Sequence, residues 1–278
     1  MIKQLQCLIT ALKAESTPLI QQLKLERDKK LDFPFFVNQE SSISLIGVGV
    51  GKKHIKSRIM EYMNYIDDQN VQFINIGIAG GKRSKTKIGD LYMINQICDE
   101  KLDKKYYPDI LLNHTFNECA ITTVENPILS GGEKYDTLVD MESHEIFSSC
   151  SKFVPLQNIA ILKIISDHMN NNESVFKENF VSKLINDKMD MILHFIHQFK
   201  SIHKMVTPLL FKDDENWIDD IIKKYLFTSY QRDQLVKYIK GYRIRNNEDQ
   251  LPKFEFEIPK TKVDQKKIFH LIRETLKA

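Results

Sequence analysis

The sequence has few of the features that mark several common protein classes. It contains four cysteines in 278 residues, and no two of them form a Cys-x-x-Cys pair. Free thiols in a reducing compartment therefore fit this chain better than a disulfide framework or a zinc site. No apolar run reaches the roughly 18 residues of a membrane-spanning helix. The N-terminal apolar patch becomes charged at once, which favours a first core strand over a signal peptide. We expect a cytoplasmic protein with no membrane partner, no metal and no cofactor.

An excess of charge of one sign is also missing. The chain has 40 Lys and Arg against 37 Asp and Glu, a net charge of +3. This balance argues against nucleic acid as a partner. The composition is 42% hydrophobic and 28% charged, which suffices for a sizeable core. We expect one large α/β domain, alone or with a small appendage.

Short apolar runs alternate with helical segments over the first two hundred residues. We predict strands at residues 5–11, 33–37, 42–48, 71–78, 88–94, 119–124 and 159–165. Residues 12–18 are interpreted as the turn into a helix, and further helices are predicted at 54–65 and 177–199. The polar stretch 99–118 is interpreted as a substrate-side loop region. This alternation predicts a mixed α/β sheet flanked by helices.

Acidic residues stand at both ends of one strand-helix-strand unit. The unit opens on the run Asp140-Met141-Glu142 and closes on Ser166-Asp167, after an apolar strand. Ligands bind beyond the carboxyl ends of strands in open α/β sheets, so Asp167 is well placed for chemistry. Its position is equally compatible with a cap on the next helix.

Two further segments have both a structural and a functional interpretation. Glu15 lies in the first turn of the first helix, where a carboxylate favours the helix dipole. The glycine run from Gly47 to Gly51 joins a strand to a helix and could bind an anion. It matches neither the dinucleotide fingerprint nor the P-loop, and close packing at a tight turn is the commoner reason for such glycines.

Five motifs in order resemble the purine nucleoside phosphorylase and nucleosidase superfamily. They are ALKAES, GVGVGK, INIGIAGG followed by IGDLYMI, VDMES, and ISD, and they cover about residues 3 to 200. The hydrolytic branch, the methylthioadenosine/S-adenosylhomocysteine nucleosidases, is the most similar. The phrases ITTVENPI and VDMES also resemble the nucleosidase attributed to hopanoid synthesis, which removes adenine from an adenosyl lipid precursor. The resemblance implies a central mixed, barrel-like sheet surrounded by helices.

The resemblance also implies roles for residues near the sugar. Glu15 would activate the attacking water. Glu142 would accept hydrogen bonds from the ribose hydroxyls, and Met141 would pack on the sugar. These residue types suit the chemistry, because breaking an N-glycosidic bond builds positive charge on the ribose, which a carboxylate stabilises.

At the base, the resemblance implies that Asp167 protonates the purine at N7 as it leaves, with Ser166 orienting the carboxyl group. Ala79 and Gly80, at the end of a central strand, would contact the substrate. A leaving-group acid must carry a proton near neutral pH. We expect Asp167 to be buried, because burial favours the protonated form of a carboxyl group.

Hydrolysis is favoured over phosphorolysis. Related phosphorylases carry arginines in segments that read ALKAES and INIGIAGG here, and neither contains one. Lys13 is present, but Glu15 would repel phosphate. A phosphate-dependent purine nucleoside phosphorylase and a non-catalytic nucleoside sensor remain the alternatives.

The chain departs from the family pattern at two places. Ile78 stands where methylthioadenosine nucleosidases commonly carry a serine that touches the nucleophile. The run Glu125-Asn126-Pro127 stands where they offer an aromatic ring to the base. The residue that stacks on the base and the 5′ substituent of the substrate are therefore not assigned.

Four other residues favour structural interpretations. His168 is interpreted as a solvated loop residue, although it could reach the base pocket. His194 and His197 are interpreted as helix-surface residues, because no carboxylate pattern beside them supports a metal site. Cys150 is interpreted as a small buried residue.

Residues 205–278 differ in character from the nucleosidase-like domain predicted at residues 1–204. We predict a helical extension with helices at 211–227, 228–246 and 264–278 and an extended segment at 251–260. Plausible helix caps are Asp213, Asp214 and Thr228-Ser229. Its basic-aromatic cluster suggests either a solvated helix face or contact with nucleic acid or another anionic partner, and comprises Lys237, Tyr238, Lys240, Tyr242, Arg243 and Arg245. The extension could alternatively cover the active-site mouth or a subunit interface. We expect a homodimer whose small-molecule partner is a purine nucleoside.

Overall fold

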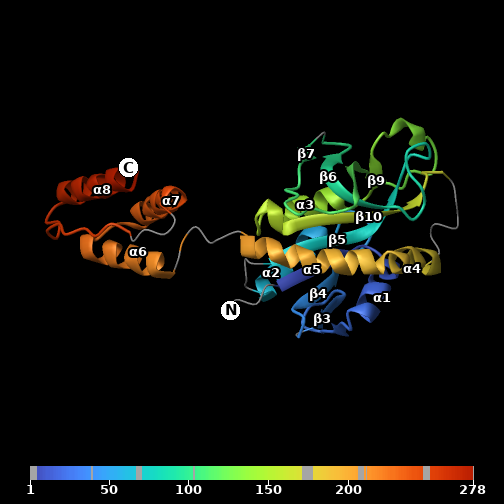
Figure 1. The fold of residues 1–278 in the computed structure, drawn as a ribbon, viewed down its shortest axis with the longest axis horizontal. Helices are drawn as coiled ribbons and strands as arrows, with labels where there is room; N and C mark the ends of the chain where they lie inside the picture. Colours follow the sequence, from blue (N-terminus) through green and yellow to red (C-terminus); the bar gives the residue numbers. More distant parts are fainter. Residues whose placement is uncertain are drawn as a thin grey trace. The chain divides into compact units, whose positions relative to one another are not determined.

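The computed structural model describes residues 5–38, 40–66, 71–102, 104–170, 178–205, 210, 212–246 and 251–277. The chain divides into two compact units, Met1–Met205 and Val206–Ala278. Figure 1 shows a first unit of mixed strands and helices and a second unit of helices. No helix in the described part of the chain is long and apolar enough to cross a membrane.

The first unit is built on one mixed sheet. Its strands are β1 (Leu5–Thr10), β2 (Glu26–Arg27), β3 (Phe35–Asn38), β4 (Ile43–Gly47), β5 (Val71–Gly80), β6 (Leu91–Asp99), β7 (Lys105–Tyr106), β8 (Asn117–Thr123), β9 (Leu138–Asp140) and β10 (Ile159–Asp167). The strand order is β10-β6-β8-β9-β5-β1-β4-β3-β2, with β7 on β6. Because β10 also pairs with β5, the strands β5, β9, β8, β6 and β10 close into a barrel. The predicted mixed, barrel-like sheet is confirmed.

Helices pack on both faces of this sheet (Figure 1). They are α1 (Lys13–Gln22), α2 (Ile55–Ile66), α3 (Ser143–Cys150), α4 (Glu178–Asp187) and α5 (Met189–Met205). Alternate residues of the central strands β1, β5, β6 and β10 enter two different apolar clusters, as the period of two in a strand requires. Phe73 packs with α2 and α3 residues such as Ile59 and Ile146. Its neighbour Ile74 packs with α4 and α5 residues such as Ile185.

Strand register brings the predicted site segments together. Gly80 at the end of β5 lies opposite Val139 of β9 and opposite Asp167 of β10. The parallel pairing of β1 with β5 places the turn from β1 into α1 beside the same strand end. Segments that are far apart in the sequence therefore meet at one end of the barrel.

The first helix starts earlier than predicted. α1 begins at Lys13 and contains Pro18, which the sequence placed in the preceding turn. Pro18 has no N–H, so it leaves the carbonyl of Ala14 without its donor four residues on. The hydroxyl of Ser182, on α4, donates to that carbonyl over 2.8 Å. A tertiary hydrogen bond thus replaces the one that the proline removes.

Two other predicted elements have different boundaries. The helix predicted at 177–199 is two helices, since α4 ends at Asp187 and α5 begins at Met189. Ile185 of α4 and Ile192 of α5 are both fully buried in the same apolar cluster. The break between the helices therefore lets the apolar face of each helix pack on the sheet. The strand predicted at 88–94 begins at Leu91, because Gly89 in the preceding turn has a φ of +88°.

The second unit consists of α6 (Lys212–Tyr225), α7 (Ser229–Arg245) and α8 (Lys262–Lys277) around its own apolar core. Residues 251–260 contain neither helix nor strand, as predicted. The hydroxyl of Tyr225 donates to the carbonyl of Phe254 and accepts the N–H of Phe256. Thr228 caps α7 through a capping box with Gln231, which confirms that prediction.

The interpretation of the basic residues of this unit is corrected. Arg243 is buried and forms an ion pair with the buried Asp214, over 2.9 Å from Nε to Oδ2. Asp214 is therefore a core residue and not an exposed helix cap. Tyr238 and Tyr242 pack against the apolar core. The predicted basic-aromatic cluster is consequently not one continuous surface patch.

Candidate active site

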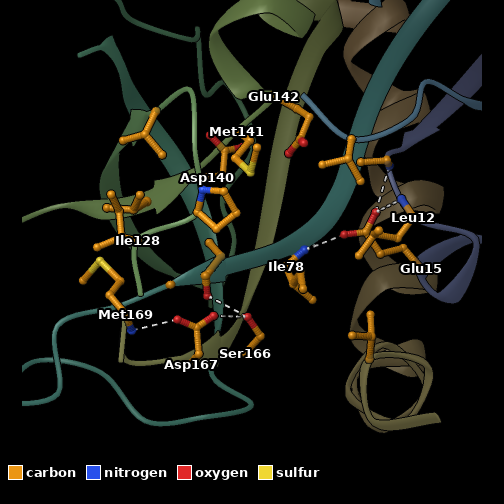
Figure 2. A pocket seen from close by; sticks show the side chains of 18 of the residues that line it. Leu12, Glu15, Ile78, Ile128, Asp140, Met141, Glu142, Ser166, Asp167 and Met169 are labelled. Atoms are coloured by element: carbon orange, nitrogen blue, oxygen red, sulfur yellow. Dashed lines mark hydrogen bonds between the residues drawn. The ribbon is translucent and has the colours of Figure 1, made fainter. Parts of the chain in front are cut away.

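A cavity of about 320 Å³ lies at the end of the barrel where β5, β9 and β10 meet. It is also lined by the N-terminal turn of α1, by residues 124 and 127–129, and by Met169, Asn170 and α4. All seven predicted site residues line it: Glu15, Ala79, Gly80, Met141, Glu142, Ser166 and Asp167. Figure 2 shows Glu15 and Asp167 on different sides of this cavity, with Glu142 and Met141 between them.

Residues 99–118 do not form the predicted substrate-side region. No described residue of this stretch lines the cavity. Three of its side chains, Ile110, Leu112 and Phe116, instead pack partly buried on the core cluster beside α5, where Phe116 contacts the ring of Phe195. These contacts hold this part of the stretch against α5 and away from the cavity.

The carboxylate of Glu15 is buried and held by three main-chain donors. Oε2 accepts the N–H groups of Ala11 and Leu12 over 2.8 and 2.9 Å. Oε1 accepts the N–H of Ile78 over 2.9 Å. Burial raises the pKa of Glu15, against the opposing effects of Lys163 and these hydrogen bonds. The main chain at Ile78 thus contacts Glu15 at the position where related nucleosidases carry a serine.

Lys163 is the main feature of the site that the sequence reasoning missed. Its side chain is buried at the centre of β10, and Nζ lies 2.9 Å from Oδ2 of Asp140. Burial lowers its pKa, but the charges of Asp140, Glu142 and Glu15 outweigh burial, and the net pKa is raised. Lysine is almost never fully buried unless it is paired. The single lysine in the apolar run Ile159–Ile165 therefore indicated, from the sequence alone, a buried lysine with a charged partner.

Asp140 anchors Lys163 to the turn between β9 and α3. Its Oδ1 accepts the hydroxyl of Thr123 over 2.8 Å. Its Oδ2 accepts both the N–H and the hydroxyl of Ser143, over 2.9 and 2.5 Å. With the ammonium group of Lys163, this carboxylate accepts from four donor groups on three residues, so its orientation is fixed.

The glycine run after β4 donates a hydrogen bond to a carboxyl group of the same protein, that of Glu142. Gly51, with a φ of +73°, donates its N–H to Oε1 of Glu142 over 2.7 Å. Burial, and then the charge of Asp140, raise the pKa of Glu142 to about 7. Glu142 is therefore poised to change its charge close to neutral pH.

Asp167 is half-buried, and not fully buried as predicted. The hydroxyl of Ser166 donates to its Oδ2 over 2.7 Å, and the N–H of Met169 donates to its Oδ1 over 2.7 Å. Both bonds appear as dashed lines in Figure 2. The ring of His168, half-buried, lies with Nδ1 3.1 Å from the carbonyl oxygen of Gly81.

Other candidates have no place in the cavity. Cys150 is buried and free, as predicted, and burial raises the pKa of its thiol well above the usual value. His194 and His197 are exposed on α5. Within the described residues, no group of three or more His, Cys, Asp or Glu side chains is arranged to hold a metal ion.

No protein-family model matches this sequence, and no curated protein matches it. Solved structures do match. The fold resembles that of solved methylthioadenosine/S-adenosylhomocysteine nucleosidases. The resemblance that the motifs indicated is thereby confirmed at the level of the fold.

Three of these structures illustrate the likeness. A Helicobacter pylori methylthioadenosine nucleosidase mutant, with 5′-methylthioadenosine in its active site, is 18% identical and has a TM-score of 0.60, covering 70% of this chain and 99% of its own. Helicobacter pylori futalosine hydrolase is 17% identical with a TM-score of 0.60, covering 71% and 99%. A Colwellia psychrerythraea methylthioadenosine/S-adenosylhomocysteine nucleosidase in complex with adenine is 15% identical with a TM-score of 0.60, covering 71% and 96%.

Proposed function

We propose that this protein hydrolyses the N-glycosidic bond of a purine nucleoside, with adenine as the base, and releases the free base. The observation that carries the proposal is the meeting of Glu15, Glu142 and Asp167 in one cavity of about 320 Å³. These carboxyl groups come from three distant parts of the chain and have different partners. A cavity of this size is within the usual range for small-molecule sites.

Glu15 and Glu142 serve the sugar in this proposal. As the bond between C1′ and N9 breaks, positive charge develops on the ribose, and the two carboxylates stabilise it. Glu142 accepts hydrogen bonds from the ribose hydroxyls, and Met141 packs on the sugar. Water attacks C1′ and transfers a proton to Glu15, whose raised pKa suits a general base.

Asp167 serves the base. Its Oδ1 accepts a fixed main-chain N–H, from Met169, whereas Oδ2 accepts the hydroxyl of Ser166, which can rotate away; in this mechanism Oδ2 is therefore the oxygen that transfers the proton. That proton passes to N7 as the bonding electrons of the C1′–N9 bond move onto the purine. The hydroxyl of Ser166 lies 2.7 Å from Oδ2 and 3.4 Å from the carbonyl oxygen of Ala79. Before the proton transfer, the Ser166 hydroxyl can donate to the carbonyl of Ala79. After the transfer, it can donate to the carboxylate of Asp167.

The charges around the cavity support water over phosphate as the nucleophile. Lys13 is the single cationic side chain among the described lining residues, and it is exposed. Lys163 lies behind the lining, bonded to Asp140 and close to two further carboxyl groups. Among the described lining residues, a phosphate dianion at C1′ would face Glu15 and Glu142, with only the exposed Lys13 to balance its charge. Homodimer assembly and a cytoplasmic location stay predictions from the sequence.

Base release without phosphate tests the proposal. The protein is incubated with adenosine, methylthioadenosine, S-adenosylhomocysteine and 5′-deoxyadenosine in phosphate-free buffer, and free adenine is followed by chromatography. We expect adenine and a free sugar from at least one of them. Adenine and ribose 1-phosphate formed only after phosphate is added would identify a phosphorylase. No base under either condition would refute glycosidic cleavage of these nucleosides.

The variant Asp167→Asn tests the acid. Asparagine keeps the shape of the side chain but cannot transfer the proton, so turnover should fall about a hundredfold or more. The matched control is Asp187→Asn at the exposed end of α4, which should keep wild-type turnover. Steady-state kcat is the measurement, and near-normal kcat in Asp167→Asn would remove Asp167 from the mechanism.

A further inference from the structure

The described residues that line the cavity around Asp167 include no aromatic ring. We call this part of the cavity the base end, and its residues are Gly80, Val124, Ile128, Asp167 and Met169. No Phe, Tyr, Trp or His is present among the described residues that line the cavity. Among the described residues, the groups that a heterocyclic base against Asp167 can contact are aliphatic and thioether groups, and Met169 is the most polarizable of these.

The side chain of Met169 is fixed in place by two glycines. It is 3% exposed and packs with Val124, Tyr135 and Val139. A Cβ on Gly80 would lie 2.7 Å from Cγ of Met169, and a Cβ on Gly132 would lie 2.3 Å from its Cβ. Because both contacts are far below van der Waals distance, the two glycines make room for this methionine. Held in this way, Met169 is one of the residues that line the cavity.

The main chain of Met169 is also in an unusual conformation. Its φ is +56°, a left-handed region that residues other than glycine, asparagine and aspartate seldom adopt. In this conformation its N–H points at Oδ1 of Asp167, over 2.7 Å. Strained backbone of this kind persists where the surrounding structure requires it, often at functional sites. One residue thus positions the carboxyl group and supplies the apolar surface beside it.

We propose that Met169 is the residue that recognises the base, with its thioether forming the face on which the heterocycle packs. This inference rests on the proposed function and extends it from the carboxyl groups to the base. Methionine sulfur makes favourable contacts with aromatic rings, and its unbranched side chain adapts to their outline. The substrate class is therefore a nucleoside with a planar heteroaromatic base that the described lining holds by sulfur and aliphatic contacts.

Methyl resonances of methionine give a direct test. The protein is labelled with ¹³C at the methionine methyl groups, and the Met169 signal is assigned by its loss in Met169→Leu. Adenine, the base that we expect the protein to release, is then added to saturation. Ring current from the base should shift the Met169 methyl signal, while that of Met60, exposed on α2, stays in place. A Met169 signal that does not move at saturation would overturn the inference.

Kinetics provide a second, independent test. Met169→Ala removes the thioether but keeps the N–H that holds Asp167, so the inhibition constant of adenine and the KM should rise about tenfold while kcat changes little. Met169→Leu conserves volume and should fall between wild type and alanine. Met60→Ala is the control. Unchanged adenine affinity in Met169→Ala would contradict the inference, and thermal unfolding of each variant identifies any loss of folding. If the alanine variant does not fold, the methyl shift and the leucine variant decide.

The outcomes separate this inference from the proposed function. If the wild-type protein neither cleaves a nucleoside nor binds adenine, the proposed function fails. If it releases adenine while the Met169 methyl signal is unmoved and Met169→Ala binds adenine normally, the proposed function stands and the role of Met169 alone is rejected.

Discussion

At the residue scale, the site depends on how closely Glu15 and Lys163 approach β5. A Cβ built on Gly77 would lie 2.9 Å from Oε1 of Glu15 and 3.4 Å from Nζ of Lys163. The glycine therefore occupies the point between the carboxylate and the ammonium group. A methyl group here would displace the carboxylate of Glu15, which main-chain donors hold on both sides, whereas the distance to Lys163 is an ordinary contact.

The substitution Gly77→Ala should consequently disable the site without removing the fold. Displacement of Glu15 removes the general base, and kcat should fall about a hundredfold. The control is Gly241→Ala in α7, where the nearest atom to an added Cβ is 3.6 Å away and alanine favours a helix. Turnover of both variants is measured beside circular dichroism. Wild-type kcat in Gly77→Ala would show that Glu15 has room to move.

A second residue-scale feature is the titration of Glu142. Burial raises its pKa in the folded protein to about 7, from the ordinary value of 4.5. Between these two pH values the folded state binds a proton that the unfolded state has released. By linkage, the free energy of unfolding then falls as pH rises from 4.5 through 7. The raised pKa of Glu15 acts in the same direction.

We therefore predict that the first unit is more stable at pH 5.5 than at pH 8. The full contribution of Glu142 over its titration is about 3 kcal/mol. Urea unfolding at several pH values measures it, and Glu142→Gln should flatten the dependence because glutamine has no charge to bury. An equally steep dependence in Glu142→Gln would assign the effect to other groups.

At the scale of elements, α1 combines a catalytic candidate with an unusual helix start. Glu15 accepts the N–H groups of Ala11 and Leu12, which a helix N-terminus leaves without partners. Pro18 then interrupts the hydrogen bonds within the helix, and Ser182 of α4 supplies the missing donor to Ala14. The geometry of the site thus depends on packing between α1 and α4.

Removing that donor should weaken this packing. We expect Ser182→Ala to lower the free energy of unfolding by about 1 kcal/mol. The loss should be smaller when Pro18→Ala restores an N–H to the helix, so the two changes form a double-mutant cycle. Ser201→Ala, whose hydroxyl bonds within α5, is the control. Denaturant unfolding provides the values, and strict additivity would show that Ser182 and Pro18 do not act on the same carbonyl.

At the scale of the whole molecule, the two units have separate cores. All the lining residues of the cavity lie between residues 11 and 181, in the first unit. The second unit has its own apolar cluster and the buried pair of Asp214 and Arg243. Disrupting that pair should therefore affect the second unit without changing turnover.

We predict that Asp214→Ala destabilises the second unit by about 3–5 kcal/mol, because it leaves Arg243 charged and buried. Limited proteolysis should cut residues 206–278 faster, while kcat/KM for the best nucleoside stays within about twofold of wild type. Asp219→Ala, which removes an exposed partner of Arg232, is the control. A large loss of activity in Asp214→Ala would show that the second unit contributes to catalysis.

Much of the fold and part of the site could be predicted from the sequence. Motif order identified the barrel-like sheet and the acids at its end, because these depend on runs of neighbouring residues. Met169 was not predicted, since its left-handed backbone and its two glycine neighbours are distant from each other along the chain. The path of residues 99–118 was wrong for a similar reason, because their apolar partners lie on α5.

The sequence by itself determined the alternation of strands and helices, and it supplied the carboxyl groups of Glu15, Glu142 and Asp167. The tertiary structure alone decided what surrounds them. It placed Lys163 beneath two of these carboxyl groups, directed the N–H of Gly51 to Glu142, and set Met169 beside Asp167. The physical reason is separation along the chain. Secondary structure depends on patterns of neighbouring residues, whereas burial and charge pairing arise between distant residues that only folding brings together.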